Sequence, residues 1–587
     1  MCGIFGFSRV SQDNPDALLD AMAQMQLHRG PDGEGRYVTD KFALGMRRLS
    51  IIDINSGHQP FYSENQDIVV FCNGEIFNYV ELRSELEKDG VKFKTHSDIE
   101  VLPHLYEKHG LEFVHLLNGM YGICIFDKKT NSIHLVRDRL GVKPIYYSFE
   151  NGIFAYASEL KSILALNTFK PTVDFSALST YLDLLYIPCP KTGFNEIKKI
   201  PSGSVLTFNA SGIKISQYWG PQKFQPIEDE NLILEKIESL LEDSIRIQMR
   251  SDVPVGAYLS GGLDSSGVVA YASTFTETPL NTFHLSWENL KGKINEESYA
   301  KGVSSLYKTN FNLSNFSDID LLNLLPKLIW HMEEPLADAA FVPTYTLAKT
   351  AAESVKVVLS GAGGDELFGG YSNHKKYPLH ESFLRLILQN SCPASSSYDR
   401  WKDNRYNWKK IFSWYEKNSG KEEFDTIFKK FKNDDELNAQ MLSDTFNYLQ
   451  DDILLLTDKM TMATSLECRV PLLDHRLVEL SWQIPSRFKV KNNERKFIFK
   501  KLLEKKLPHE LIYRKKEGFG IPVDAWTERY LKEFQGILSN GYLARNNLIK
   551  LADINEIRSW QLWKVVVLEI WAQLFIEGKK ASDINQA

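Results

Sequence analysis

The sequence predicts a protein of the α/β and α+β classes with a parallel sheet in its C-terminal part. An apolar run over 253–258 precedes a Gly/Ser-rich turn, Leu259–Ser266, and the small and apolar residues from Gly267 onward favour a helix. The same order returns where the apolar run 355–359 meets a second glycine-rich stretch, 360–371. Predicted strands and helices alternate between these points, which is typical of a parallel sheet with ligands at its carboxyl edge. With 587 residues, the chain is long enough for two or more domains.

The first turn, Leu259–Ser266, has the composition of an anion cradle. Free backbone N–H groups at a helix N-terminus attract an anion, and Gly261 and Gly262 let the backbone approach it closely. Asp264 is a poor neighbour for a phosphate, so we expect a divalent cation between them. The P-loop pattern is absent, because no Gly-Lys-Ser/Thr follows. The alternative is an ordinary strand-to-helix turn.

The second glycine-rich stretch, 360–371, carries five glycines and another acid, Asp365. Two loops at strand ends, each with an aspartate, can bracket one magnesium–diphosphate group, which makes Asp264 and Asp365 the predicted metal ligands. The alternative is a flexible turn, but so many glycines directly after a strand favour close approach to a ligand.

The octet from Leu259 resembles the pyrophosphate loop of ATP pyrophosphatases, enzymes that cleave ATP between the α and β phosphates and adenylate a substrate. The resemblance implies ATP as a substrate, with Mg²⁺, and an ATP site made of Leu259, Ser260, Gly261, Gly262, Asp264, Ser265, Leu285, Ser360, Gly361 and Asp365.

The composition excludes several classes of protein. The net charge is -6 and the pI is about 6.2, so no basic excess favours nucleic-acid binding. No run of about twenty apolar residues predicts a membrane span, and we expect no signal peptide. Six cysteines stand far apart without metal-site spacing, which favours a reducing compartment and a cytoplasmic protein.

Cys2 is a candidate nucleophile at the start of the chain. Removal of Met1 would place the α-amino group of Cys2, with an ordinary pKa of about 8, beside the thiol, where it can act as general base. The alternative is an incidental cysteine at the start of a strand.

Several later stretches decide between these interpretations: His28–Gly33, Arg47–Asp53, Asn73–Asn78 and His96–Glu100. Together with Cys2 they resemble the glutaminase domain of class II glutamine amidotransferases over about the first 200 residues. That resemblance implies an N-terminal-nucleophile fold of αββα layers.

The same resemblance implies a role for each matching residue. Cys2 would be the nucleophile, while Asn73 and Gly74 would form the oxyanion hole. Arg48 would pair with the α-carboxylate of glutamine and Asp98 with its α-ammonium; Glu75 and Ile51 would also bind glutamine. The alternatives are that Arg48 and Asp98 are surface charges and that Asn73-Gly74 is a hairpin turn.

The C-terminal part resembles the synthetase domain of asparagine synthetases. The resemblance rests on the stretches Asp458–Met460, Ser465–Asp474, Glu494–Phe497 and Lys516–Pro522. It implies that Lys496, on a basic helix, is catalytic and meets phosphate charge, whereas a lone lysine on a helix is more often solvated. We expect a glutaminase domain over 2–210 and a synthetase domain over 230–587, with a helical insertion of unknown role at 372–440.

The whole chain therefore resembles a glutamine-hydrolysing asparagine synthetase. That implies glutamine hydrolysis at Cys2, internal transfer of ammonia, and amidation of an adenylated carboxylate with release of AMP and pyrophosphate. We expect aspartate as the acceptor; the alternative is another carboxylate, such as a sugar carboxylate of a surface polysaccharide. A β-lactam-forming relative would lack a working N-terminal cysteine, and a non-catalytic descendant would have lost Cys2, Asp264 or Asp365. The oligomeric state stays open, and a homodimer is compatible with the sequence.

One residue, Ala362, departs from the family pattern. Asparagine synthetases carry Glu at this position, and that Glu takes part in forming the aspartyl adenylate. Either Glu333, Glu334 or Asp338 supplies the missing carboxylate, or the acceptor is not aspartate.

Overall fold

The computed structural model describes residues 2–9, 14–287, 296–316, 321–372, 374, 408–417, 421–514, 521–550, 557 and 559–586. The part of the predicted insertion 372–440 that precedes residue 408 lies mostly outside the described residues. So do Lys516 to Gly520 of the motif Lys516–Pro522. Among the helices of these described residues, none is long and apolar enough to cross a membrane.

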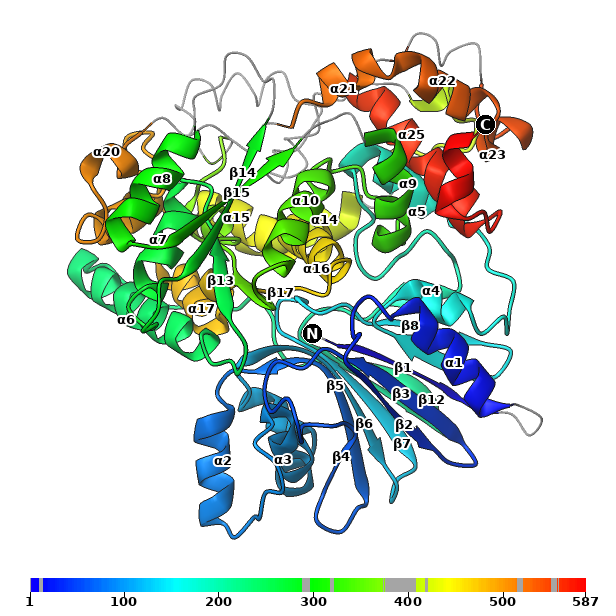
Figure 1. The fold of residues 1–587 in the computed structure, drawn as a ribbon, viewed down its shortest axis with the longest axis horizontal. Helices are drawn as coiled ribbons and strands as arrows, with labels where there is room; N and C mark the ends of the chain where they lie inside the picture. Colours follow the sequence, from blue (N-terminus) through cyan, green and yellow to red (C-terminus); the bar gives the residue numbers. More distant parts are fainter. Residues whose placement is uncertain are drawn as a thin grey trace.

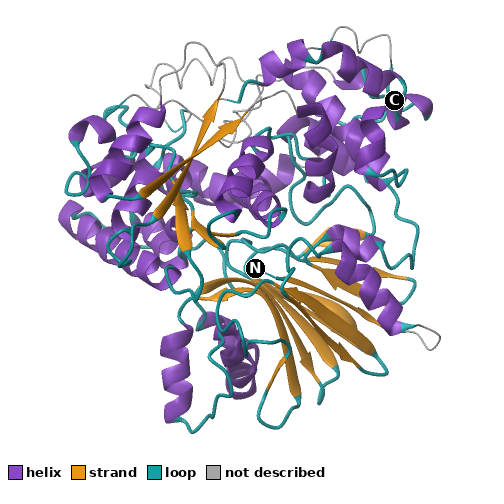
Figure 2. Ribbon diagram, viewed as in Figure 1, coloured by secondary structure: helices purple, strands orange, loops and turns teal. Residues whose placement is uncertain are grey.

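The N-terminal part consists of two six-stranded antiparallel sheets (Figures 1 and 2). The first has the strand order β10-β8-β9-β1-β3-β2 and the second the order β12-β11-β7-β6-β5-β4. The strands of the first sheet are β1 (Gly3–Ser8), β2 (Gly33–Val38), β3 (Phe42–Arg48), β8 (Tyr146–Glu150), β9 (Ile153–Ala157) and β10 (Ile197–Lys199). Those of the second are β4 (Phe61–Tyr62), β5 (Ile68–Ile76), β6 (Gly119–Asp127), β7 (Ser132–Arg137), β11 (Ser204–Asn209) and β12 (Gly212–Gln217).

Alternating side chains stack these sheets into four layers. Ile4 of β1 and Phe71 of β5 share one core between the sheets. Phe5, the next residue of β1, packs on the opposite face with Leu19 and the other apolar residues of α1. The covering helices are α1 (Pro15–Met25), α4 (Leu160–Leu164) and α5 (Phe175–Leu184) on one side and α2 (Tyr79–Lys88) and α3 (Val101–His109) on the other. The predicted αββα architecture is confirmed.

The C-terminal part contains the predicted parallel sheet, with strand order β15-β14-β13-β16-β17. Its strands are β13 (Val255–Tyr258), β14 (Asn281–Trp287), β15 (Asn310–Phe316), β16 (Val357–Leu359) and β17 (Glu467–Arg469). From β13 the chain builds outward first through β14 and β15 and then, on the other side, through β16 and β17. The loops after β13 and β16 are therefore neighbours at the point where strand order reverses, the usual ligand position in such sheets.

Helices surround this sheet and close the C-terminal part (Figure 2). They are α6 (Glu230–Gln248), α7 (Leu263–Ala272), α8 (Glu296–Tyr307), α9 (Leu321–Met332), α10 (Phe341–Ala352), α11 (Gly364–Phe368), α14 (Lys421–Phe431), α15 (Glu436–Phe446), α16 (Leu455–Met462), α17 (His475–Gln483), α18 (Ser486–Lys489), α19 (Phe497–Leu503), α20 (His509–Ile512), α21 (Val523–Arg529), α22 (Leu531–Ser539), α23 (Tyr542–Arg545) and α25 (Ser559–Phe575).

Residues 218–229, between β12 and α6, contain neither helix nor strand. The second antiparallel sheet extends past residue 210, because β12 pairs with β11 along its whole length. The start of β1 lies where the antiparallel sheets meet the C-terminal part, so the N-terminal residues of the chain are close to both (Figure 1).

Candidate active sites

Cys2 lies directly before β1 and is 6% exposed. Its backbone nitrogen donates to Asn73 Oδ1 at 3.2 Å, and its thiol is 4.0 Å from the carbonyl oxygen of Leu49. Burial raises the pKa of the thiol, and the nearby Arg48 guanidinium partly opposes that rise. A thiol in this position needs a base beside it before it becomes a nucleophile.

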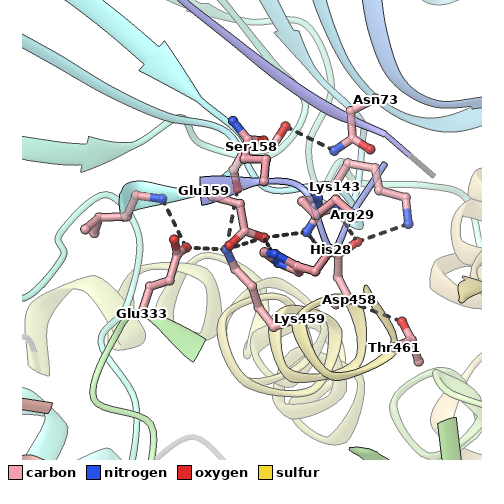
Figure 3. Close-up of polar contacts among 12 residues, drawn as sticks. His28, Arg29, Asn73, Lys143, Ser158, Glu159, Glu333, Asp458, Lys459 and Thr461 are labelled. Carbon is pink, nitrogen blue, oxygen red and sulfur yellow. Dashed lines mark hydrogen bonds and ion pairs between the residues drawn. The ribbon is translucent and has the colours of Figure 1, made fainter. Parts of the chain in front are cut away.

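Asn73 and Gly74 lie inside strand β5, so the alternative of a hairpin turn is wrong. A Cβ on Gly74 would stand 2.0 Å from the carbonyl oxygen of Met120, which only glycine avoids. Asn73 Nδ2 donates to Ser158 Oγ at 3.2 Å (Figure 3). Since a carboxamide nitrogen carries two hydrogens, one remains for an oxyanion beside Cys2.

Arg48 is a buried residue, 5% exposed, and not a surface charge. Its Nη2 donates to the carbonyl of Asp53 at 2.7 Å, and it also contacts the carbonyls of residues 52 and 54. These bonds fix the guanidinium beside the loop that holds Ile51, which is buried too. The backbone N–H of Asp252, in the C-terminal part, donates a hydrogen bond to the carbonyl of Ile51 at 3.0 Å.

Asp98 and Glu75 are the two acids predicted to bind glutamine, and both are buried. The N–H of Ile76 donates to Asp98 Oδ2 at 2.9 Å. Burial nevertheless raises the pKa of Asp98 to about 6. Burial also raises the pKa of Glu75, and the neighbouring carboxylates of Asp98 and Glu467 add to that rise. An α-ammonium group bound here would favour the charged forms of both acids.

The loop after β13 has the hydrogen bonds of a preformed cradle. The hydroxyls of Ser260 and Ser265 lie 2.9 Å apart, and the N–H of Gly262 donates to Ser260 Oγ at 3.2 Å. Gly261 has a φ of +76°, and a Cβ there would stand 2.8 Å from the nitrogen of Ala300. Helix α7 then begins at Leu263, so its free N–H groups face this loop.

Three charged residues meet between the two glycine-rich loops. Lys496 Nζ lies 2.5 Å from Asp264 Oδ2 and 2.7 Å from Asp365 Oδ1. Burial would lower the pKa of Lys496, but the two carboxylates raise it above its ordinary value. Glycines permit this approach: a Cβ on Gly370 would lie 1.7 Å from Asp365 Oδ1, and one on Gly364 2.4 Å from Asp264 Oδ1.

The prediction that Lys496 stands on a helix is wrong in one respect. Helix α19 begins at Phe497, and Lys496 is its N-cap with a left-handed backbone, φ 55°. Its side chain is buried against Asp264 and Asp365, and the residue is 4% exposed. The alternative that Lys496 is a solvated lysine is therefore also wrong.

The remaining residues of the predicted ATP site line the adjoining strands. Leu259 follows β13, and its carbonyl is 2.8 Å from His284 Nδ1 of β14. Leu285, next on β14, is buried. Ser360 begins the second loop, and its N–H donates to the carbonyl of Arg469 at 2.8 Å.

A buried network of charges joins the two parts of the chain (Figure 3). Arg29 Nη1 contacts Glu159 Oε1 at 2.9 Å and Asp458 Oδ2 at 2.8 Å, and its Nε donates to the carbonyl of Cys2 at 3.0 Å. Lys459 pairs with Glu159 and with Glu333. The backbone next to Cys2 is thereby tied to helix α16 of the C-terminal part.

Sequence reasoning assigned no role to Arg29, Glu159, Asp458, Glu467 or Arg469. Except for Glu159, they stand in stretches quoted for the family resemblance, and all five are 2% exposed or less. Charged residues within an apolar stretch of sequence could have pointed to these buried ion pairs. An example is Leu466-Glu467-Cys468-Arg469-Val470, a short apolar stretch that carries the charged side chains Glu467 and Arg469.

The candidates for the carboxylate missing at Ala362 are separated by their contacts. Glu333 accepts from the N–H of Leu160 and that of Lys161, and Glu334 accepts from Tyr146 and Lys199. Both acids thus have N-terminal-part partners. Asp338 instead lies near the second glycine-rich stretch. The hydroxyl of Tyr448 donates to Asp338 at 3.4 Å, and the ring of Tyr448 lies 6.1 Å from the ring of Tyr371, the last residue of that stretch.

Two family models match the chain: a glutamine amidotransferase domain over residues 1–219 and asparagine synthase over residues 236–573. Asparagine synthetase [glutamine-hydrolyzing] 1 of Bacillus subtilis (strain 168) is 33% identical, over 99% of this chain and 98% of that protein. Asparagine synthetase B [glutamine-hydrolyzing] of Escherichia coli (strain K12) is 32% identical, over 66% of this chain and 68% of that protein. A putative asparagine synthetase [glutamine-hydrolyzing] 2 of Methanocaldococcus jannaschii is 39% identical over 66% of this chain and 80% of its own.

Proposed function

The chain belongs to the asparagine synthase family and is a glutamine-dependent ligase. From this premise we propose that it converts aspartate to asparagine with glutamine as nitrogen donor. The observation that carries the proposal is the convergence of Asp264, Asp365 and Lys496 between two glycine-rich loops, in a chain that also begins with a buried cysteine beside Asn73. The proposed domains are 2–210 for glutamine hydrolysis, extended to residue 217 by the pairing of β12 with β11, and 230–587 for amide synthesis. Its proposed location is the cytoplasm, and its proposed assembly a homodimer.

In the first reaction, the Cys2 thiolate attacks the carboxamide carbon of glutamine. Met1 must be removed first, so that the freed α-amine can take the thiol proton. Asn73 Nδ2 and the N–H of Gly74 stabilise the oxyanion. Ammonia leaves, a γ-glutamyl thioester remains on Cys2, and water hydrolyses it to glutamate. Arg48, Ile51, Glu75 and Asp98 hold the amino-acid end of glutamine.

In the second reaction, a carboxylate oxygen of aspartate attacks the α phosphorus of ATP, and pyrophosphate leaves. Ammonia then attacks the acyl carbon of the adenylate, and AMP leaves with its bonding electrons on the phosphate oxygen. Ser260, Ser265 and the N–H groups at the start of α7 bind phosphate oxygens. Lys496 neutralises charge that develops on the pyrophosphate.

The residues present fit a magnesium ion. Asp264 and Asp365 already approach one cation, the Lys496 ammonium, and glycines rather than bulkier residues pack against both carboxylates. Mg²⁺ is commonly held by one or two carboxylates with substrate phosphates completing its shell. Bound there, Mg²⁺ would neutralise phosphate charge, and Asp264 and Asp365 would hold it.

Ammonia has to pass from Cys2 to the ATP site inside the protein. The contact of Arg29 with the Cys2 carbonyl and with Asp458 supports a short route, because it puts the nucleophile at the junction of the two parts. Water excluded from this junction cannot protonate ammonia to unreactive ammonium.

One observation favours a second candidate, amidation of a different carboxylate such as a sugar carboxylate. Ala362 brings no charge and little volume to the second loop, which leaves room for a bulkier acceptor. The test is a reaction with glutamine labelled in its amide nitrogen, ATP, Mg²⁺ and a panel of carboxylates. The proposal requires labelled asparagine with AMP and pyrophosphate in equal amounts; AMP release with a sugar carboxylate but not with aspartate would favour the second candidate.

A further inference from the structure

Arg469, the last residue of β17, extends from the parallel sheet toward Glu75, one of the predicted glutamine-binding residues. It is fully buried. Its Nη1 donates to the carbonyls of Gln248 at 2.6 Å and Arg250 at 2.7 Å, and its Nε pairs with Glu467 at 2.6 Å. These contacts fix the guanidinium plane and direct its remaining nitrogen, Nη2, across the junction between the two parts.

Across that junction, Nη2 faces Glu75, a predicted glutamine-binding residue. The distance from Nη2 to Glu75 Oε2 is 3.7 Å, which is an ion pair without a hydrogen bond. Both atoms are buried, and among the residues that the structure describes neither atom has a hydrogen-bond partner. Such a pair can tighten or loosen as the charge around Glu75 changes, because the 3.7 Å between its two atoms is not closed by a hydrogen bond.

The backbone of the same residue supports the ATP side. Arg469 pairs with Leu359 in the parallel register of β16 and β17, and its carbonyl accepts from the N–H of Ser360 at 2.8 Å. Ser360 opens the loop that carries Asp365. One residue therefore contacts an acid of the glutamine pocket through its side chain and the start of a phosphate loop through its backbone.

The strength of the contact between Arg469 Nη2 and Glu75 Oε2 depends on the other charges around Glu75. Three buried carboxylates, those of Glu75, Asp98 and Glu467, lie close enough to the Arg469 guanidinium for their negative charges to raise its pKa. The α-ammonium of glutamine supplies a second positive charge beside Asp98 and Glu75. Its arrival compensates the charge of Glu75 and so weakens the 3.7 Å ion pair to Arg469 Nη2, while the hydrogen bonds of Nη1 and Nε keep the guanidinium on its own strand.

We propose that Arg469 is a positioning residue that couples glutamine binding to ATP binding, through Glu75 on one side and Ser360 on the other. The inference rests on the proposed function, since it needs glutamine at the first site and ATP at the second. Coupling of this kind is reciprocal: the factor by which ATP changes the affinity for glutamine equals the factor by which glutamine changes the affinity for ATP.

The test uses the full-length Cys2→Ala protein, in which glutamine stays intact. Calorimetry measures the Kd of glutamine with and without α,β-methylene-ATP and Mg²⁺, and the Kd of the nucleotide with and without glutamine. We expect both ratios to be equal and about fivefold or more. Adding Arg469→Lys should bring both ratios to within about twofold of one, while each ligand alone still binds.

Two further variants separate coupling from folding. Glu75→Gln removes the charge of the other partner in the ion pair and should also remove the coupling. It therefore tests the inference independently if Arg469→Lys unfolds the protein. Asn118→Ala is the matched control: it deletes another hydrogen bond across the junction, 2.9 Å from Asn118 Nδ2 to Asp474 Oδ2, and should leave the ratios unchanged.

The outcomes distinguish this inference from the proposed function. Equal affinities with and without the second ligand in the Cys2→Ala parent, or full coupling retained in both Arg469→Lys and Glu75→Gln, would overturn the inference alone. Failure of the parent to bind glutamine at all would overturn the proposed function with it.

Discussion

Lys496 and Asp264 form an ion pair with 2.5 Å between Nζ and Oδ2, although 232 residues separate them in the sequence. Asp365 joins the same ammonium from the second loop. The lysine thus links the two phosphate loops through their aspartates.

This arrangement predicts the effect of neutralising either aspartate. Asp264→Asn or Asp365→Asn should lower asparagine synthesis by roughly 100-fold or more, because an amide cannot replace a carboxylate toward Mg²⁺ and Lys496. Glutamine hydrolysis by the same variants is the internal control and should persist. Products are measured by chromatography, and ADP with phosphate in place of AMP with pyrophosphate would refute adenylation.

Replacing the nucleophile should separate the two reactions. Cys2→Ala is expected to reduce glutamine hydrolysis by roughly 10⁴-fold or more, whereas synthesis with added ammonium chloride should continue. Cys124→Ala, which removes another buried thiol between the same two sheets, is the matched control. Undiminished glutamine-dependent synthesis by Cys2→Ala would exclude Cys2 as nucleophile.

The pH dependence of glutamine binding should follow Asp98. Its pKa is raised to about 6, chiefly by burial, and only the carboxylate form attracts an α-ammonium. The KM for glutamine should therefore rise as the pH falls through about 6, by about tenfold one unit below it. Asp98→Asn should show a high KM without this pH dependence. The measurement is glutamate release from pH 5 to 8; a level profile in the unaltered protein would contradict the assignment.

Ala362 makes a prediction about the acceptor. A charge-assisted hydrogen bond is worth about 1.5–3 kcal/mol, or about ten- to a hundredfold in rate. We expect a low kcat/KM for aspartate, an increase of that size in Ala362→Glu, and a further loss in Asp338→Asn. Steady-state kinetics with saturating ATP and glutamine tests this. If Ala362→Glu leaves kcat/KM for aspartate unchanged, the second loop does not contact the acceptor.

The buried junction predicts a large effect on stability. Burial raises the pKa of Asp458, but Arg29 and Lys143 more than offset this, so its pKa is below the ordinary value. Asp458→Asn removes the anion that the buried cations Arg29 and Lys143 share, although Arg29 keeps Glu159. It should lower the free energy of unfolding by about 3–5 kcal/mol at pH 7.

The sign of its pH dependence follows from the lowered pKa. The contribution of Asp458 is fully present above its unfolded pKa of about 4 and is lost as the pH falls toward the folded value. The difference between wild type and Asp458→Asn in denaturant unfolding should therefore shrink below about pH 4. Glu238→Gln, which breaks the exposed pair with Lys505, is the control and should cost no more than about 1 kcal/mol. A similar small effect for Asp458→Asn would show that the junction is not held by this charge.

The sequence by itself determined the order of strands, glycine-rich loops and helices around Leu259–Ser266 and 360–371. It also made Cys2 a candidate nucleophile. These features could be predicted because they are local: a close backbone approach requires glycine at one position, and alternation along a strand is visible within a few residues. Family resemblance added the αββα fold.

Only the tertiary structure decided which charges meet. It placed Lys496 between Asp264 and Asp365, Arg469 opposite Glu75, and Arg29 against Asp458, which is 429 residues away. It also showed that Lys496 precedes its helix with a left-handed backbone, a conformation that residue type does not predict for lysine. Ion pairs act across a few ångströms of space, so their partners depend on which strands become neighbours in the fold and not on their spacing along the chain.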